Sequence, residues 1–217
     1  VVFAIDRAGI VGDDGATHHG TFDLSYLRHI PNMTIAAPSD AFELREMLSL
    51  ALEHDGPFAI RYPRGPSPII PREAAEMALG KAEVLAEGED VCIMAVGSAV
   101  NLSLRAMEIL AETGVSATLV NARFVKPLDE ELIIELAKRC PRLVLVEENA
   151  VQGGFGSAVI ELLASEGICD VQVRQVGLSD EFVAHGARPV LRELHGLDPD
   201  HIARVAADLV TKRQPVD

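Results

Sequence analysis

Short apolar runs alternate with amphipathic stretches along most of the chain. Three of these runs, VVFAI (1–5), MTIAAP (33–38) and FAIRYP (58–63), are short and bounded by Pro or Gly. They are too continuously apolar for an antiparallel sheet with one solvated face, and parallel strands that are buried on both faces have this pattern. The alternation predicts an α/β fold with two doubly wound, mostly parallel sheets. In the second half it predicts strands over 91–97, 116–122, 142–148 and 171–177, and helices over 99–113, 129–138, 188–195 and 199–212, with another helix ending near 165.

The stretch SDAFELREMLSLALEHDG joins the second and third apolar runs and predicts a helix over 40–54. Ser39 or Asp40 can cap its first turn, and Gly56 ends it. Strand, helix and strand together form a βαβ unit. One face of the predicted helix carries apolar side chains, namely Leu44, Leu48, Ala51 and Leu52.

Four prolines between 63 and 71 interrupt this pattern. Proline disfavours both the interior of a helix and a central strand, so a domain boundary is expected here. The sequence thus predicts a first unit over 1–64, a linker over 65–80 and a second unit over 81–217.

Composition excludes some partners. The 217 residues are 48% apolar, enough for a well-filled core, and 33 acidic against 19 basic residues give a net charge of −14. This charge repels nucleic acid and anionic membranes, so an anionic ligand would need a local arginine cluster. No apolar run reaches the roughly 18 residues of a membrane span, and no signal peptide is evident.

Cysteine usage and the first residue suggest where the chain belongs. Cys92, Cys140 and Cys169 are widely separated without ligand spacing, which predicts buried thiols in a reducing cytoplasm. A strand-like run begins at Val1 without an initiator Met, so we expect natural sequence upstream and a longer enzyme of which this is the C-terminal part. In that case VVFAI and the helix over 40–54 should expose apolar faces in this chain.

The segment DRAGIVGDDGATHHGTF (6–22) directly follows the first predicted strand. Ligands of open α/β sheets bind at the carboxyl ends of strands, where this segment begins. Asp14 could orient the imidazole of His18 for proton transfer or for donation to an oxyanion. Composition leaves the alternative equally open, in which the segment only makes turns and its histidines face water. Adjacent His18 and His19 have no partner at ligand spacing, which disfavours a metal site.

RYPRG (61–65) lies at the end of another strand, on the same edge of the sheet as Arg7. Two guanidiniums that meet there could hold a phosphate through paired hydrogen bonds. Arg64 could equally form only a surface salt bridge, and Arg61, inside the strand, is the weaker candidate.

Three glycines follow a strand and open a helix in VEENAVQGGFGSAV (146–159). Their free amides could cradle an anion, but the P-loop lysine and the GxGxxG fingerprint are absent. Close packing of the strand against the helix is the favoured interpretation.

Five separated segments, in this order, resemble the 1-deoxy-D-xylulose-5-phosphate synthases, a branch of the transketolase-like thiamine diphosphate enzyme family. The similarity extends from Val1 to about Leu209. The resemblance implies that 1–64 is the latter part of a pyrimidine-binding domain and that 81–217 is a transketolase C-terminal domain. The segments are DRAGIVGDDGATHHGTFDLSYLRHIPNMTIAAPSD, DGPFAIRYPRG, RFVKPLDEELI, VEENAVQGGFGSAVIELL and FVAHGARPVLRELHGLD.

What the resemblance implies about activity is specific. Pyruvate and D-glyceraldehyde 3-phosphate are condensed, with release of CO2, to 1-deoxy-D-xylulose 5-phosphate, a precursor for isoprenoid, thiamine and pyridoxal synthesis. Thiamine diphosphate and Mg²⁺ are the cofactors, bound mainly by residues upstream of this chain, so the chain alone is expected to be inactive. The enzyme is expected to be a cytoplasmic, bacterial homodimer.

The site residues follow from the same resemblance. Asp14 and His18 match the active-site aspartate and histidine, and Arg7 and Arg64 match the arginines that hold the phosphate of the acceptor. His19 stands where relatives often have Gln and is given no catalytic role. Transketolase, the beta subunit of a 2-oxo-acid dehydrogenase and a non-catalytic dimerisation module remain the alternatives.

Overall fold

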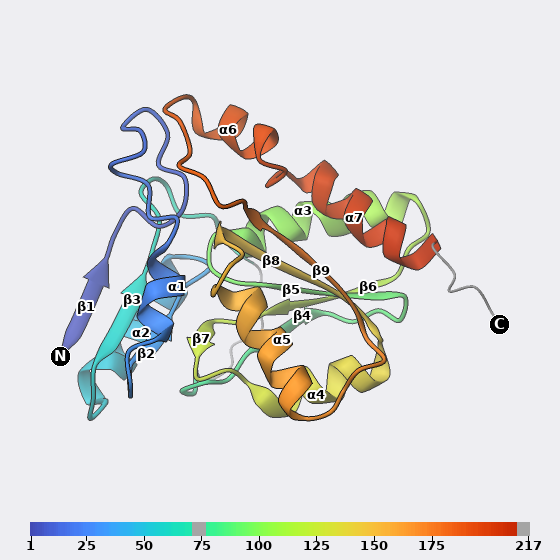
Figure 1. Cartoon of the computed structure of the whole chain (residues 1–217), viewed down its shortest axis with the longest axis horizontal. Helices are drawn as coiled ribbons and strands as arrows, with labels where there is room; N and C mark the ends of the chain where they lie inside the picture. Colours follow the sequence, from blue (N-terminus) through green and yellow to red (C-terminus); the bar gives the residue numbers. More distant parts are fainter. Residues whose placement is uncertain (71–76, 212–217) are drawn as a thin grey trace.

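The computed structural model describes residues 1–70 and 77–211, so part of the predicted linker, 71–76, lies outside the described residues. It contains two sheets with helices between and around them (Figure 1). The predicted α/β class with two mostly parallel sheets is confirmed. Side chains from both sheets meet in one buried cluster.

The first sheet has the strand order β1-β3-β2-β7. Strands β1 (Val2–Ile5) and β2 (Thr34–Ala36) both pair in parallel with β3 (Phe58–Arg61) between them. The fourth strand, β7 (Phe124–Lys126), comes from the second half of the chain and pairs antiparallel with β2. Sequence reasoning missed β7 because three residues carry no periodic signal. It also missed the short helix α1 (Asp23–Arg28).

The second sheet has the order β4-β6-β5-β8-β9. Four of its strands are parallel, and β4 (Glu83–Ala86) joins the edge antiparallel to β6. The parallel strands β5 (Val91–Ala95) and β6 (Ala117–Asn121) are buried along their whole length, as their continuous apolar runs predict. The remaining strands are β8 (Arg142–Ala150) and β9 (Gln172–Leu178).

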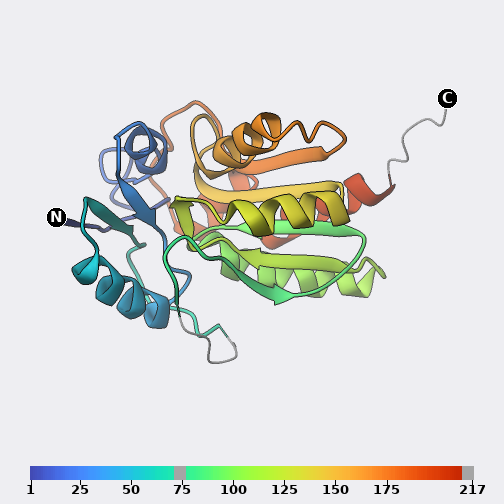
Figure 2. The same ribbon diagram turned by 90° about the horizontal axis from the view of Figure 1, so that it is seen from below.

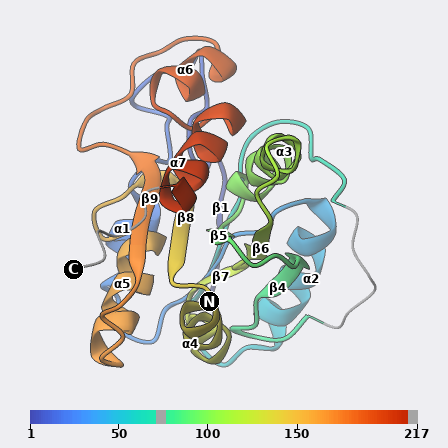
Figure 3. The same ribbon diagram turned by 90° about the vertical axis from the view of Figure 1, so that its right-hand side faces the viewer.

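Helices cover both faces of the second sheet (Figure 3). One face packs under α3 (Ala99–Glu112) and α7 (Pro199–Thr211), and the other under α4 (Glu130–Arg139) and α5 (Phe155–Ser165). The short α6 (Arg188–Leu194) precedes α7 and lies near the loop that follows β1 (Figure 1). In the view from below, the first sheet and α2 (Ala41–Glu53) lie at one end of the second sheet (Figure 2).

The core is continuous between the two halves. A single cluster of buried side chains contains Leu24, Met33 and Ile35 from the first half with Leu145 and Phe155 from the second. Another cluster of buried side chains comes almost entirely from the second half, so 81–217 has a core of its own and also buries apolar surface against the first unit. Mutual burial of apolar area is what holds such layers together.

Helix α2 buries only part of the predicted apolar face, since Leu44 is partly buried. Asp40 caps it by accepting the Glu43 amide at 2.9 Å. Met47 and Ala51 are buried, whereas Leu48 and Leu52 are 46% and 74% exposed. The buried side of the helix also carries Glu43, whose charge is compensated by Arg123 from the second half at 2.6 Å.

Several exposed apolar side chains match the expectation of uncovered faces. Val1, which precedes β1, and Phe3 within it are 83% and 44% exposed, and Leu48 and Leu52 of α2 are exposed as well. All three cysteines are free; Cys92 and Cys140 are buried, but Cys169 is exposed, so the prediction of three buried thiols is wrong for Cys169. Its position in the loop between α5 and β9 explains the exposure.

Within 1–70 and 77–211, every helix is too short or too polar to cross a membrane.

Candidate functional site

The loop from 6 to 22 leaves the carboxyl end of β1 and returns to its own base. Gly20 closes that base: it accepts the Gly9 amide at 2.8 Å and donates to the Arg7 carbonyl at 3.0 Å. A Cβ on Gly20 would lie 2.6 Å from the Arg7 oxygen, so only glycine permits this closure. Arg7 itself has a φ of 59°, an uncommon conformation for a non-glycine residue, and it turns the chain out of the strand.

Arg7, Asp14 and Arg64 converge above the ends of β1 and β3. The Oδ2 atom of Asp14 accepts from Nη1 of Arg7 at 2.8 Å and from Nη1 of Arg64 at 2.5 Å. The side chains are 35%, 34% and 61% exposed, in the order Arg7, Asp14, Arg64, so solvent and ligands can reach the cluster. Parallel pairing of β1 with β3 explains why residues 57 positions apart meet at one edge.

His18 lies in the same loop but does not contact Asp14 within the described part of the chain. Its Nδ1 is 3.1 Å from the Thr17 hydroxyl, and its backbone amide donates to the Gly15 carbonyl at 3.0 Å. The imidazole is exposed. The structure therefore brings the two arginines together on Asp14 and leaves His18 beside them as a separate, accessible group.

His19 connects the loop to the second half of the molecule. Its Nδ1 accepts the Val11 amide at 2.9 Å, and its Nε2 is 3.1 Å from the carbonyl of Ala184. With Nδ1 accepting, Nε2 carries the proton and donates to that carbonyl. Gly186 reinforces the contact by donating its amide to the Gly12 carbonyl at 3.4 Å. Both ring nitrogens of His19 are thus used for structure.

Arg61 differs from Arg64 in being 2% exposed. Its Nε donates to Asp23 at 2.9 Å, and its Nη2 donates to the carbonyls of Gly20 at 2.6 Å and Glu148 at 2.9 Å. It holds the base of the loop against β8. Because Arg61 lies inside the strand, the sequence makes it a weaker candidate than Arg64 for binding a ligand. These contacts agree with that interpretation.

The glycine-rich turn before α5 is filled by a side chain of the protein itself. Glu147 accepts the amides of Phe155 at 2.7 Å and Gly156 at 2.8 Å. Burial raises the pKa of Glu147 to about 7, against the lowering effect of these amides. A Cβ on Gly154 would lie 2.1 Å from Glu147 Oε2, so the glycine is required by close packing. The carboxylate occupies the place that an anion would take, as the packing interpretation expects.

Glu148, the next residue, was not singled out from the sequence. Its carboxylate is buried and paired with Arg192 at 2.6 Å and Arg188 at 3.3 Å. Ser98 also donates to it, at 2.6 Å. Burial opposes ionisation, but Arg192 and Arg188 outweigh it and lower the pKa of Glu148 to about 2. The feature of the sequence that could have pointed to Glu148 is the pair of acidic residues at the end of an otherwise apolar strand.

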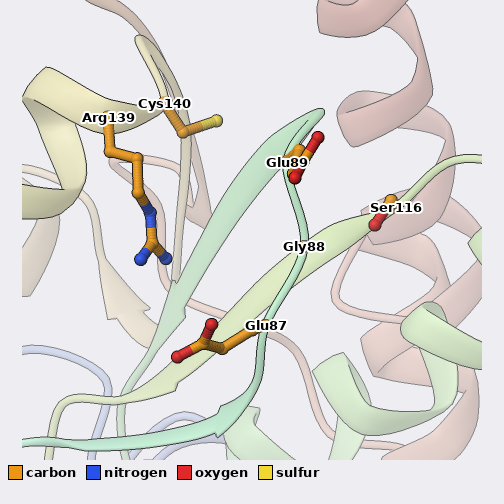
Figure 4. Close-up of a pocket in the computed structure, with 6 residues that line it drawn as sticks. All are labelled: Glu87, Gly88, Glu89, Ser116, Arg139 and Cys140. Carbon is orange, nitrogen blue, oxygen red and sulfur yellow. The ribbon is translucent and has the colours of Figure 1, made fainter.

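Two hollows differ in their position relative to this cluster. One of about 570 Å³ lies at the amino ends of β5, β6 and β8, the edge where ligands of parallel sheets seldom bind. Figure 4 shows Arg139 extending from the end of α4 toward the β4–β5 connection that carries Glu87. A second of about 310 Å³ is lined in part by Tyr62, Pro63 and Gly65, which flank Arg64 in the chain.

Comparison with known proteins agrees with the geometry. Residues 1–68 match the family of the transketolase pyrimidine-binding domain, and residues 80–202 match that of the transketolase C-terminal domain. The chain belongs to the transketolase family, whose members are thiamine diphosphate-dependent transferases.

Among curated relatives, 1-deoxy-D-xylulose-5-phosphate synthase 1 of Geobacter sulfurreducens is 55% identical over 99% of this chain. The synthase of Aquifex aeolicus is 49% identical over 96% of it. The alignments span 34% and 33% of those proteins, so the chain spans about a third of their length.

Solved structures show the same fold. A split-gene transketolase, described as an inactive beta4 tetramer, has a TM-score of 0.89 and 32% identity, with coverage of 99% of this chain and 68% of that one. A transketolase mutant from Pichia stipitis has a TM-score of 0.77 at 24% identity, over 96% and 30% of the two chains. The second likeness concerns the fold alone.

Proposed function

We propose that the chain is the C-terminal part of a 1-deoxy-D-xylulose-5-phosphate synthase, which condenses pyruvate with D-glyceraldehyde 3-phosphate and releases CO2. The product would feed isoprenoid, thiamine and pyridoxal synthesis. Support comes from relatives of that name at 49% to 55% identity over nearly the whole chain. Bacterial relatives also support a bacterial, cytoplasmic enzyme, and we propose that it is a homodimer.

The observation that carries this proposal is the convergence of Arg7 and Arg64 on Asp14. Each guanidinium uses Nη1 for the carboxylate, and its other nitrogens have no partner within residues 1–70 and 77–211. Two forked donors at a fixed separation suit the oxygens of a dianionic phosphate. In a protein with a net charge of −14, this local positive pair supplies the attraction that the whole surface lacks.

We assign proton transfer to His18 and the spacing of the arginines to Asp14. The Nε2 atom of His18 has no partner in the described part of the chain, while Nδ1 faces Thr17. An exposed imidazole in this position can hold or donate a proton to a substrate oxygen whose charge changes. Asp14 keeps two like charges close together, which they would otherwise resist.

Thiamine diphosphate with Mg²⁺ is the cofactor that the family implies, and it would supply the carbanion chemistry. The residues of this chain do not fit its diphosphate, because Glu147 fills the one glycine-rich helix start that sequence analysis had considered. The described residues also contain no group of three His, Cys, Asp or Glu side chains suited to a metal ion. We propose that other parts of the enzyme hold most of the cofactor.

We retain the division into 1–64, a linker over 65–80, and 81–217 as part of the proposal. Matches of one family model to 1–68 and of another to 80–202 support it. Strand β7 crosses this division by pairing with β2, so the two units act as one scaffold for the loop.

Replacing Arg64 by Ala in the complete enzyme tests the proposal. Loss of a charged donor should raise the KM for D-glyceraldehyde 3-phosphate about 10- to 100-fold and leave the KM for pyruvate nearly unchanged. Steady-state kinetics with each substrate varied in turn would measure both.

Unphosphorylated glyceraldehyde is the matched control, because it lacks the group that Arg64 would bind. Equal losses with both acceptors would contradict a phosphate site at Arg64. Preference of the unmodified enzyme for a ketose donor, or for a lipoyl acceptor, would favour transketolase or a 2-oxo-acid dehydrogenase component instead.

A further inference from the structure

Glu148 connects the candidate site to the second half of the molecule. Besides its two arginines, its Oε1 accepts the amide of Ile10 at 3.0 Å. Ile10 is fully buried and stands between Arg7 and Asp14 in the loop. A hydrogen bond that an ionised, buried carboxylate accepts is among the stronger ones in a protein. The bond from the Ile10 amide to Glu148 therefore anchors the loop at this point.

Close approach of the loop to Glu148 depends on Gly9. A Cβ on Gly9 would lie 2.5 Å from both Cγ and Cδ of Glu148, and its φ is +70°. The backbone therefore rests directly on the carboxylate side chain, with no room for an intervening group. Small displacements of Glu148 must move the loop, because interiors are close-packed.

Arg188 extends the same network to the other arginine of the cluster. Its Nη2 binds Glu148, while its Nη1 donates to the backbone carbonyl of Arg64 at 3.3 Å. Gly65 has a φ of +127°, which favours glycine at this turn directly after Arg64. One carboxylate thus contacts the loop of Arg7 and Asp14 directly, and the backbone of Arg64 through one guanidinium.

We propose that Glu148 is a positioning residue, which sets the separation of Arg7, Asp14 and Arg64 through the Ile10 amide and through Arg188. The inference rests on the proposed function, because it concerns affinity for the phosphate of the acceptor. It gives the C-terminal unit a part in substrate recognition, although Glu148 itself is buried and does not reach the substrate.

Glu148→Gln in the complete enzyme tests this role, with Glu147→Gln as the matched control. Both replacements remove a buried carboxylate of the same strand, but the Glu147 carboxylate accepts its hydrogen bonds from the start of α5 and not from the loop. We expect Glu148→Gln to raise the KM for D-glyceraldehyde 3-phosphate about tenfold and the KM for pyruvate less than about twofold. Glu147→Gln should leave both KM values near those of the unmodified enzyme. Equal changes in the two variants would overturn the inference.

A second pair of variants is available if Glu148→Gln does not fold. Arg188→Gln and Arg192→Gln each remove one guanidinium from Glu148, and only Arg188 contacts Arg64. The KM for the phosphorylated acceptor should rise more in Arg188→Gln than in Arg192→Gln. The opposite order, or no difference, would contradict the path through Arg188.

Backbone hydrogen exchange separates this inference from the proposed function. Amides of residues 9–20 should exchange faster in Glu148→Gln than in Glu147→Gln, whatever the substrate is. Equal exchange would refute positioning, even if Arg64→Ala behaves as proposed. Faster exchange, together with an unaltered acceptor KM in Arg64→Ala, would uphold the anchoring of the loop and refute the phosphate site.

Discussion

The loop after β1 and the turn after β8 are alike in sequence and opposite in use. Each is rich in glycine, follows the carboxyl end of a parallel strand and carries acidic residues nearby. In the turn, Glu147 accepts the amides of Phe155 and Gly156, so these two donors are not available to a ligand. In the loop, Asp14 and His18 remain exposed to solvent.

This difference teaches that a glycine-rich turn is a site only when its polar groups are not satisfied from within. Glycine permits close approach in both segments, but what approaches differs. At Gly154 it is a carboxylate of the preceding strand, and at Gly20 it is the loop's own backbone. Stability should therefore depend on the turn, and activity on the loop.

The largest effect should come from the loop, through His18→Ala in the complete enzyme. Loss of a positioned proton donor typically lowers turnover by about 10²- to 10⁴-fold. The fold should survive, because the ring is exposed and, among the described residues, its hydrogen-bond partner is the Thr17 hydroxyl. Turnover and the melting temperature would be measured together; near-normal turnover would end the assignment of His18.

Replacing Gly154 in the turn by Ala should lower the stability of the protein. The new Cβ would lie 2.1 Å from Glu147 Oε2 and 2.8 Å from the Ala150 oxygen. We expect a loss of about 3 kcal/mol in the free energy of unfolding, measured with urea.

Gly114→Ala is the control for that replacement, since nothing lies within 4 Å of its Cβ position and only its φ of +78° is unfavourable. It should cost about 1 kcal/mol. Equal losses at the two glycines would mean that contact with Glu147 does not determine the role of the turn.

Next in size is the pH dependence that Glu147 introduces. Its pKa rises to about 7 in the folded state, so its contribution to stability is full below about 4.5 and is lost as the pH rises through 7. Glu147→Gln should therefore gain stability relative to the unmodified protein between pH 5 and 8, by on the order of 2 kcal/mol. Urea unfolding across this range would measure it.

The pKa of Glu148 is shifted in the opposite direction from that of Glu147, so the two residues should affect the pH dependence of stability in opposite ways. Its pKa of about 2 lies below the ordinary value, so its contribution is present above about 4.5 and is lost as the pH falls toward 2. Parallel stability curves for Glu147→Gln and the unmodified protein would contradict the raised pKa of Glu147.

The smallest effect is expected at His19, which belongs to the loop but serves its structure. Removing the ring contacts with Val11 and Ala184 by His19→Ala should cost about 1 kcal/mol of unfolding free energy. His19→Gln should cost less, because an amide can both accept and donate. Turnover that falls as far as in His18→Ala would show that His19 takes part in the chemistry.

Much of the scaffold could be predicted from the chain itself. Strands such as Val91–Ala95 are buried on both faces and consist only of apolar residues, so their type is evident without any partner. The short β7 could not be predicted, because it exists only through its pairing with β2. The short helix α1 was missed as well. The pairing of buried Glu43 on α2 with Arg123 likewise could not be predicted, because Arg123 lies 80 residues away along the chain.

The sequence pointed to candidate site residues, which stay a prediction, but not to the contacts among them. Position at strand ends pointed to Arg7 and Arg64, and the same reasoning ranked Arg61 lower. Spacing suggested that Asp14 would orient His18, whereas in the structure Asp14 binds both arginines. The spacing of residues tells which of them are close along the chain. The pairing of the strands decides which side chains come into contact.

By itself, the sequence determined the α/β class, most of the strands and helices, and the identity of the exposed polar residues in the loop. These depend on local periodicity and on the solvation of single side chains. Only the tertiary structure decided that Glu147 fills the glycine-rich turn while Glu148 binds Arg188, Arg192 and the Ile10 amide. The two glutamates are adjacent and chemically identical, but neighbouring residues of a strand point to opposite faces, so each meets different partners.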